Sequence, residues 1–219
     1  MVQFKRHKRK LYCVGALCLG CVLLFLGRSY VLTKSNEAVA SQVPHLELES
    51  MDALPPLQIG DVILRMGVGA DSYVIASASH SQYSHVGMIS ALEPEILVTH
   101  ASTVDDPPAN FEGVSTITLK DFVYQGQRIA IVRYKDFSLQ EQKSIQEYLF
   151  AQEGKAFVIS NDSNAFYCTT LVLKALQDKV PLHLKPTFMS IPLLTGDYYM
   201  PQALLEEPLA KVIYYYPRS

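Results

Sequence analysis

An uncharged apolar run near the amino terminus sets the first limit on how this chain folds. Residues 11–27 (LYCVGALCLGCVLLFLG) carry no charge, a basic cluster at residues 5–10 precedes them, and Arg28 closes the run. Its 17 residues are at the short end of what crosses a bilayer core of ~30 Å. A buried core helix is the alternative, but a basic block before an apolar run at the amino terminus is typical of an export or anchor signal.

Two further readings of this segment stay open. A cleaved signal peptide needs a small-x-small site, and the only good one, at residues 38–40 (AVA), lies 11 residues beyond the run. A lipoprotein would place a cysteine after a Leu-x-x-small pattern; Cys21 follows Gly20, but Cys18 stands where the leucine belongs. We favour an uncleaved signal anchor and transmembrane helix at residues 1–28. It predicts a membrane partner through residues 11–27, with the rest of the chain on the outer side.

The remainder of the chain is acidic. Residues 29–219 hold 13 Lys or Arg against 21 Asp or Glu, a formal net charge of −8. Nucleic-acid binding rests on basic side chains that neutralise phosphates, so this balance argues against it. Residues 29–56 are polar and end in two prolines, which predicts a linker. Residues 57–219 are then expected to form one globular domain.

Short β-branched runs and helical patterns follow one another without regular alternation, which predicts an α+β fold. Expected strands lie at residues 61–66, 85–90, 95–100, 129–134 and 211–216. A helix is expected at residues 138–152, where Ser138 and Glu141 have the spacing of a capping box. A second helix is expected at residues 167–178, with Asn164 as a candidate cap.

Cys168 is the only cysteine of the expected domain, since Cys13, Cys18 and Cys21 lie in the apolar run. Acylation of Cys13 beside the basic cluster is an alternative to its being a plain apolar residue. A lone cysteine in an exported domain is either buried and inert or reactive. Cys168 stands at the start of the second expected helix, where free backbone N–H groups and the helix dipole stabilise a thiolate and an oxyanion. The expected helix alone does not favour a reactive Cys168 over a buried and inert one.

Two histidines stand at the ends of expected strands. His85 begins one strand and His100 ends the next, so antiparallel pairing would bring both rings to one site. A cysteine nucleophile needs a base, and the base needs a third group that sets its tautomer. Cys168, His85 and His100 are the candidates for these roles, although a single histidine is more often structural. Zinc ligation is the weaker alternative, because the domain has one cysteine and no closely spaced ligand pair.

The order of the motifs resembles a known family. LQIGDVIL, SHVGMI and LVTHAS are similar to the "GD", "HVGI" and "HAS" run of NlpC-type cysteine peptidases, whose nucleophile motif "DCSGLV" comes first. Here the similar FYCTTLVLKAL comes last, as a circular permutation would place it. This order resembles the YiiX/YebB-like permuted branch of the papain-fold superfamily, which includes lecithin:retinol acyltransferase-type enzymes. That branch usually reads "YCSELV", and many of its members carry an acid where His100 stands.

The resemblance covers residues 57–216 and implies a circularly permuted papain-like fold, with the Cys168 helix packed on a small antiparallel sheet. It implies Cys168 as nucleophile, His85 as base and His100 as orienting residue. Tyr83 and Tyr167 are candidates for oxyanion or substrate contacts, and packing is the alternative for Tyr83.

We therefore expect a membrane-anchored cysteine hydrolase that attacks an amide or ester through an acyl-enzyme, with no metal or organic cofactor. Peptidoglycan peptides and lipids both fit as substrates. A lipid acyltransferase with the same triad and an inactive envelope-binding module are the alternatives. Residues 105–113 and 181–201 are expected to shape the pocket.

Overall fold

The computed structural model describes residues 45–48, 53–103, 111–160, 165–191 and 194–217. The expected anchor at residues 11–27 lies outside them, and so does most of the expected linker. Within the described ranges, no helix has both the length and the apolar character needed to cross a membrane. The described residues belong to one compact unit, which spans residues 44–219.

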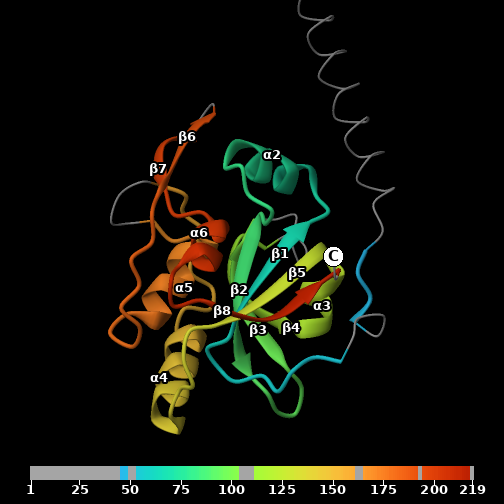
Figure 1. The fold of residues 1–219 in the computed structure, drawn as a ribbon, viewed down its shortest axis with the longest axis vertical. Helices are drawn as coiled ribbons and strands as arrows, with labels where there is room; N and C mark the ends of the chain where they lie inside the picture. Colours follow the sequence, from blue (N-terminus) through green and yellow to red (C-terminus); the bar gives the residue numbers. More distant parts are fainter. Residues whose placement is uncertain (1–44, 49–52, 104–110, 161–164, 192–193, 218–219) are drawn as a thin grey trace, which may run out of the picture. The chain divides into compact units, whose positions relative to one another are not determined.

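A six-stranded sheet, antiparallel throughout, forms the centre of this unit (Figure 1). Its strand order is β4-β3-β2-β1-β5-β8. The strands are β1 (Val62–Gly67), β2 (His85–Ala91), β3 (Leu97–Ser102), β4 (Gly113–Thr118), β5 (Gly126–Arg133) and β8 (Lys211–Tyr216). The five expected strands are confirmed with small shifts at their ends, whereas β4 was not expected from the sequence.

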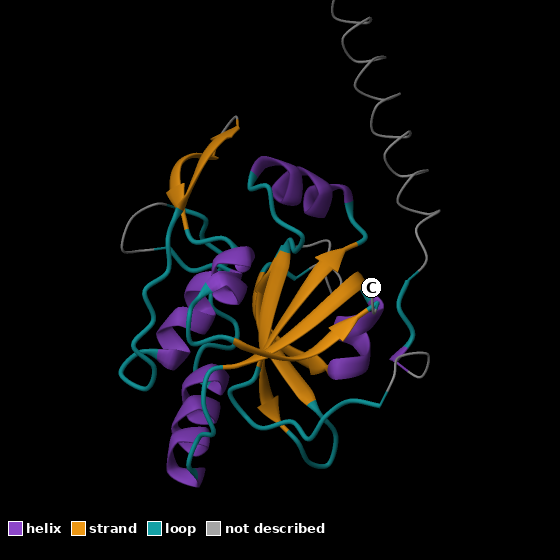
Figure 2. Cartoon of the chain, in the orientation of Figure 1, coloured by secondary structure: helices purple, strands orange, loops and turns teal. Residues whose placement is uncertain are grey.

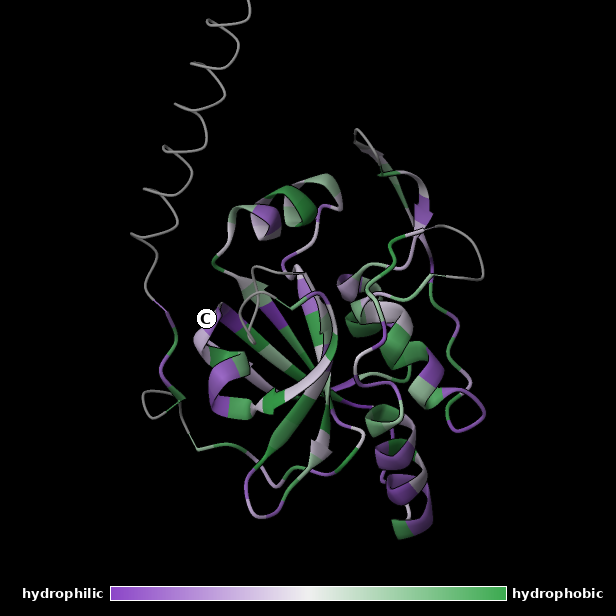
Figure 3. Cartoon of the chain, turned by 180° about the vertical axis from the view of Figure 1, so that it is seen from behind, coloured by the Kyte–Doolittle hydropathy of each residue, from purple (hydrophilic) through white to green (hydrophobic). Residues whose placement is uncertain are grey.

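Helices cover both faces of the sheet (Figure 1). On one face, α4 (Leu139–Phe150) and α5 (Cys168–Leu176) pack with alternate strand residues such as Val62, Val86 and Met88. On the other, the short α3 (Leu119–Tyr124) covers the intervening residues, among them Ile63 and Ile89. Strands buried on both faces have nearly continuous apolar sequences, and Figure 3 shows apolar residues along the central strands.

Both expected helices form, and their first turns have different caps. Ser138 accepts a hydrogen bond from the Glu141 N–H, and the Glu141 carboxylate accepts one from the Ser138 N–H, so the expected capping box of α4 is present. The cap of α5 is Tyr167; Asn164, the candidate cap, lies outside the described residues. Thr170 accepts a hydrogen bond from the Tyr167 N–H at 2.8 Å. Thr170 thus takes the part that a Glu at this third helical position plays in a capping box.

The remaining elements gather beside one end of the sheet (Figure 2). They are α2 (Ala70–Ala78), the hairpin of β6 (Thr187–Ile191) and β7 (Leu194–Tyr198), and α6 (Pro201–Glu206). The sequence did not predict them, because each is short and has no clear amphipathic period.

The last residues of the expected linker pack onto the domain. The Leu46 N–H donates to the Gly126 carbonyl at 3.1 Å, and the His45 ring stacks on Tyr124 at 4.4 Å between ring centroids. Leu48 and Leu54 pack against the α3 face of the core.

Candidate active site

Cys168 is the first residue of α5 and is buried, with 8% of its surface exposed. Helix α5 starts there because the Thr170 hydroxyl holds Tyr167 in an extended conformation as the cap. The backbone N–H groups of the first helical turn have no partner within the helix. Backbone N–H groups at such a position can donate to an oxyanion formed beside the Cys168 thiol, and the positive end of the helix dipole adds to this effect.

The two strand-end histidines lie within hydrogen-bonding distance. Strands β2 and β3 pair antiparallel, with Gly87 opposite His100. This register brings Nε2 of His85 to 2.8 Å from Nδ1 of His100. Nε2 of His100 is in turn 3.3 Å from the hydroxyl of Ser115, its cross-strand partner on β4.

This chain of hydrogen bonds favours one set of proton positions. A general base at His85 has to accept a proton on Nδ1, since Nε2 is engaged by His100. Nε2 of His85 then carries the hydrogen and donates it to Nδ1 of His100. His100 in turn donates from Nε2 to the Ser115 hydroxyl. In this arrangement a second histidine, and not a carboxylate, is placed to set the tautomer of a base at His85.

A buried cluster lies behind the two histidines. The Phe122 ring of α3 is 5.8 Å from the His85 ring and 5.6 Å from the His100 ring, measured between centroids. Arg65 is the cross-strand partner of His85; its guanidinium lies 4.5 Å from the Phe122 ring centroid and donates to the Phe122 carbonyl at 3.1 Å. Burial lowers the pKa of His85 well below 6.5, and the positive charge of Arg65 lowers it further. His85 is therefore neutral near pH 7, the form that a base requires.

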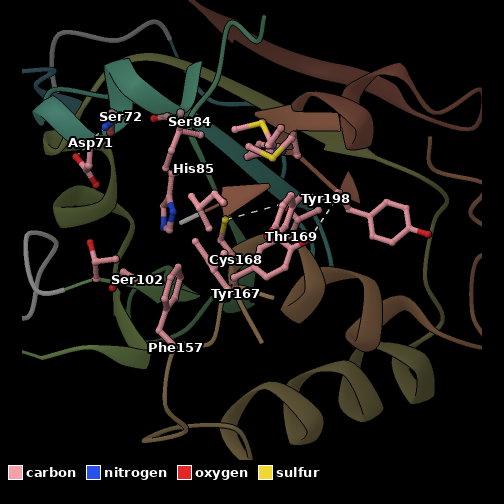
Figure 4. Close-up of a pocket in the computed structure, with 18 residues that line it drawn as sticks. Asp71, Ser72, Ser84, His85, Ser102, Phe157, Tyr167, Cys168, Thr169 and Tyr198 are labelled. Atoms are coloured by element: carbon pink, nitrogen blue, oxygen red, sulfur yellow. Dashed lines mark hydrogen bonds between the residues drawn. The ribbon is translucent and has the colours of Figure 1, made fainter. Parts of the chain in front are cut away.

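Cys168 and His85 line one pocket (Figure 4). Its described walls come from α2, β2, β3, the loop before α5, the start of α5, the β6–β7 hairpin and the start of α6. They comprise Asp71, Ser72, Ile75, Ser84, His85, Ser102, Thr103, Phe157, Ile159, Tyr167, Cys168, Thr169, Met189, Leu194, Tyr198, Tyr199, Met200 and Pro201. Apolar and aromatic side chains make up most of this lining.

The other sequence-based candidates have different positions. Tyr83 is 1% exposed in the core and does not line the pocket, so its proposed oxyanion contact has no geometric support. Burial raises the pKa of its phenol. Tyr167 lines the pocket, and its hydroxyl accepts a hydrogen bond from the Tyr199 N–H at 3.0 Å. The expected pocket segment 181–201 does contribute wall residues, whereas most of 105–113 lies outside the described residues.

The sequence did not indicate several residues of the site. Strand register brings Ser115 and Arg65 to the histidines, and the packing of α3 brings Phe122 there. None of the three belongs to a sequence motif. Ser102 had a usable signal, because it follows His100 by two residues and strand residues so spaced share a face.

A thiol at the start of a helix, in one pocket with a histidine whose ring is oriented by a second side chain, is the arrangement that defines cysteine hydrolases. The model of a family described as "permuted papain-like amidase enzyme, YaeF/YiiX, C92 family" matches residues 56–212. The chain belongs to this family, and the protein is a cysteine hydrolase with a permuted papain-like fold.

A solved structure, described as that of metalloprotein yiiX from Escherichia coli O157:H7, has a similar fold. The TM-score is 0.59 at 21% sequence identity, over 72% of this chain and 96% of that one. A search of curated proteins found no match. Among the described residues of this chain, no group of three or more His, Cys, Asp or Glu side chains is placed to hold a metal ion.

Proposed function

We propose that this protein hydrolyses an amide or ester with Cys168 as nucleophile, His85 as general base and His100 as the residue that orients His85. The observation that carries the proposal is the 2.8 Å hydrogen bond between the two histidines, together with the presence of His85 and Cys168 in one pocket. The family supports amide hydrolysis in general, and the roles of the three residues are our assignment.

In the first half of the reaction, Nδ1 of His85 takes the proton of the Cys168 thiol. The sulfur attacks the substrate carbonyl, and the oxyanion accepts hydrogen bonds from backbone N–H groups at the start of α5. When the tetrahedral intermediate collapses, Nδ1–H of His85 gives its proton to the leaving amine or alcohol. The acyl group remains on Cys168 as a thioester.

In the second half, His85 takes a proton from water, the resulting hydroxide attacks the thioester, and the proton returns to the Cys168 sulfur as the free acid leaves. If a lipid amine or alcohol replaced water, the same steps would give the acyltransferase. Mass spectrometry of the products separates the two, since hydrolysis yields a free acid and transfer yields a new amide or ester.

The pocket walls favour an apolar acyl group. Ile75, Met189, Leu194 and Met200 line the pocket, together with the aromatic rings of Phe157, Tyr167 and Tyr198. Burial of apolar substrate surface against such side chains is favourable by roughly 25 cal/mol per Å². Of the two expected substrate classes, the pocket therefore favours lipid amides or esters over peptidoglycan peptides.

We further propose that residues 11–27 anchor the enzyme in a membrane, with the catalytic domain on the outer side. The proposal rests on the uncharged run and the basic cluster before it. Fractionation of the full chain with membranes tests it.

The test of the catalytic roles is alkylation of Cys168 by iodoacetamide in the full chain in detergent, followed by mass spectrometry of the Cys168 peptide. At pH 7.5, we expect His85→Ala to slow the alkylation at least about tenfold, because the thiol loses its base. Cys168→Ala should abolish hydrolysis of a medium-chain acyl amide. His183→Ala is the matched control, since His183 does not line the pocket. Hydrolysis that survives in Cys168→Ala would refute the proposal.

A further inference from the structure

The catalytic pocket has two chemically different sides, and the side next to His85 contains a buried hydroxyl that no described group satisfies. We propose that the substrate is an amide whose amine component is polar, and that the hydroxyl of Ser102 binds this component. The inference rests on the proposed function of the same site and adds the chemistry of the leaving group.

The mechanism decides which side of the pocket receives which part of the substrate. The acyl carbon becomes bonded to Cys168, whereas the leaving amine must lie close enough to His85 to receive its proton. The amine component therefore lies on the His85 side of Cys168.

Polar side chains gather on that side. Ser84 directly precedes His85, and Ser102 is two residues beyond His100 on the same face of β3, so both are tied to the histidine pair by the chain itself. Figure 4 shows Ser84, Asp71 and Ser72 near His85 and Ser102 on the same side of Cys168, where the Phe157 ring also lies, with Tyr167 and Tyr198 on the far side.

Within the described part of the chain, Ser102 is the member of this group whose hydroxyl is buried without a hydrogen-bond partner. It is 1% exposed, and no partner for its Oγ exists among the described residues. Ser84 differs, because its Oγ accepts from the Gly67 N–H at 3.0 Å. Leaving a buried hydroxyl unpaired is unfavourable, and a ligand atom in the pocket would remove this cost.

An unpaired hydroxyl alone does not define a ligand site, as Ser90 shows. Ser90 on β2 is fully buried, and its hydroxyl also has no partner among the residues that the structure describes, but it does not line the pocket. Ser102 does line the pocket, beside the catalytic histidines. This difference makes Ser102 a substrate contact and makes Ser90 a matched control.

The experiment compares two amides that share an octanoyl group, one with serinamide and one with n-pentylamine as the leaving amine. In the full-length protein, we expect the serinamide substrate to have the higher kcat/KM. Ser102→Ala should lower its kcat/KM about three- to tenfold, mainly through KM, and leave the pentylamide unchanged. Ser90→Ala should leave the ratio of the two substrates at the wild-type value.

Protection of Cys168 from iodoacetamide by each amide is the second readout, so that slow turnover still gives an answer. If Ser102→Ala affects both amides equally, or neither, the inference is overturned while Cys168-dependent hydrolysis still stands. If the wild type cleaves neither amide and its Cys168 reacts like a free thiol, the proposed function and this inference both fail.

Discussion

The surroundings of His85 bear directly on how the proposed active site would work. His100 stands where many permuted relatives are expected to carry an acid, and a histidine ring has no negative charge to stabilise a protonated His85 as a carboxylate would. Arg65 and the burial of His85 act in the same direction. With the proposed roles, His85 rests as a neutral imidazole, and we expect the proton of Cys168 to move to it during the attack on substrate.

The lowered pKa of His85 predicts the acid side of the pH–rate profile. His85 must be neutral to act as a base, and its pKa lies well below 6.5, so activity should persist below pH 6.5. Arg65→Gln removes the positive charge, which should raise the pKa of His85 and shift the acid limb of kcat/KM to higher pH.

Arg65→Lys is the matched control, because it keeps the charge while losing the planar contact with Phe122. It should keep the acid limb near the wild-type position. Equal shifts in both variants would mean that Arg65 acts through packing alone. The lowered pKa of His85 also makes stability depend on pH. The contribution of His85 to the free energy of unfolding is fully present above pH 6.5. It declines as the pH falls toward the pKa of His85 in the folded protein, because His85 of the unfolded chain binds its proton first.

At the scale of elements, the acid of the "GD" motif is a structural residue. Asp61 directly precedes β1, is fully buried, and accepts hydrogen bonds from Arg133 of β5 at 2.8 and 2.7 Å. It also accepts from the Gln58 N–H at 2.9 Å. The Asp61–Arg133 ion pair holds the start of β1 against β5. Because β1 also pairs with β2, the position of His85 depends on this contact.

Asp61→Asn should therefore lower the free energy of unfolding by about 2–3 kcal/mol, since charge-assisted hydrogen bonds are replaced by weaker ones in a buried place. Urea unfolding followed by far-UV circular dichroism measures this loss.

Asp136→Asn is the control for Asp61. Asp136 is also near Arg133, at 3.7 Å, but its side chain is 93% exposed, so its loss should change stability by less than about 1 kcal/mol. Comparable effects of the two variants would show that the Asp61 pair is not a specific support of β1.

At the scale of the whole molecule, the chain combines a catalytic unit with an amino-terminal segment of a different character. The described unit includes residues 45–48, which pack on the α3 face of the core. The segment at residues 11–27 lies farther toward the amino terminus and carries no charge, beside a basic cluster.

If this segment is an integral anchor, the full chain should sediment with membranes, and high salt or carbonate should not release it. Detergent should release it, because apolar burial and not surface charge would hold it. A variant in which Leu23 and Leu24 are replaced by Arg should leave the pellet. Release of the wild type by salt alone would show that only the basic cluster binds the membrane.

Local patterns in the sequence determined a large part of this structure. Five strands were predictable because β-branched runs with turn residues at their ends form strands in most environments, and α4 because its capping box is contained in four consecutive residues. The motif order also indicated the permuted papain-like fold and the family, both of which the comparisons confirm.

The tertiary structure alone decided how the site is assembled. His85 and His100 lie on the α3 face of the sheet, whereas Cys168 begins a helix that packs on the opposite face, so the site forms where β2 begins and β3 ends. The contacts of Ser115 and Arg65, like the exclusion of Tyr83 from the pocket, follow from strand register and packing. Register is a relation between two strands and depends on the turn that joins them, so the sequence of one strand alone does not specify it.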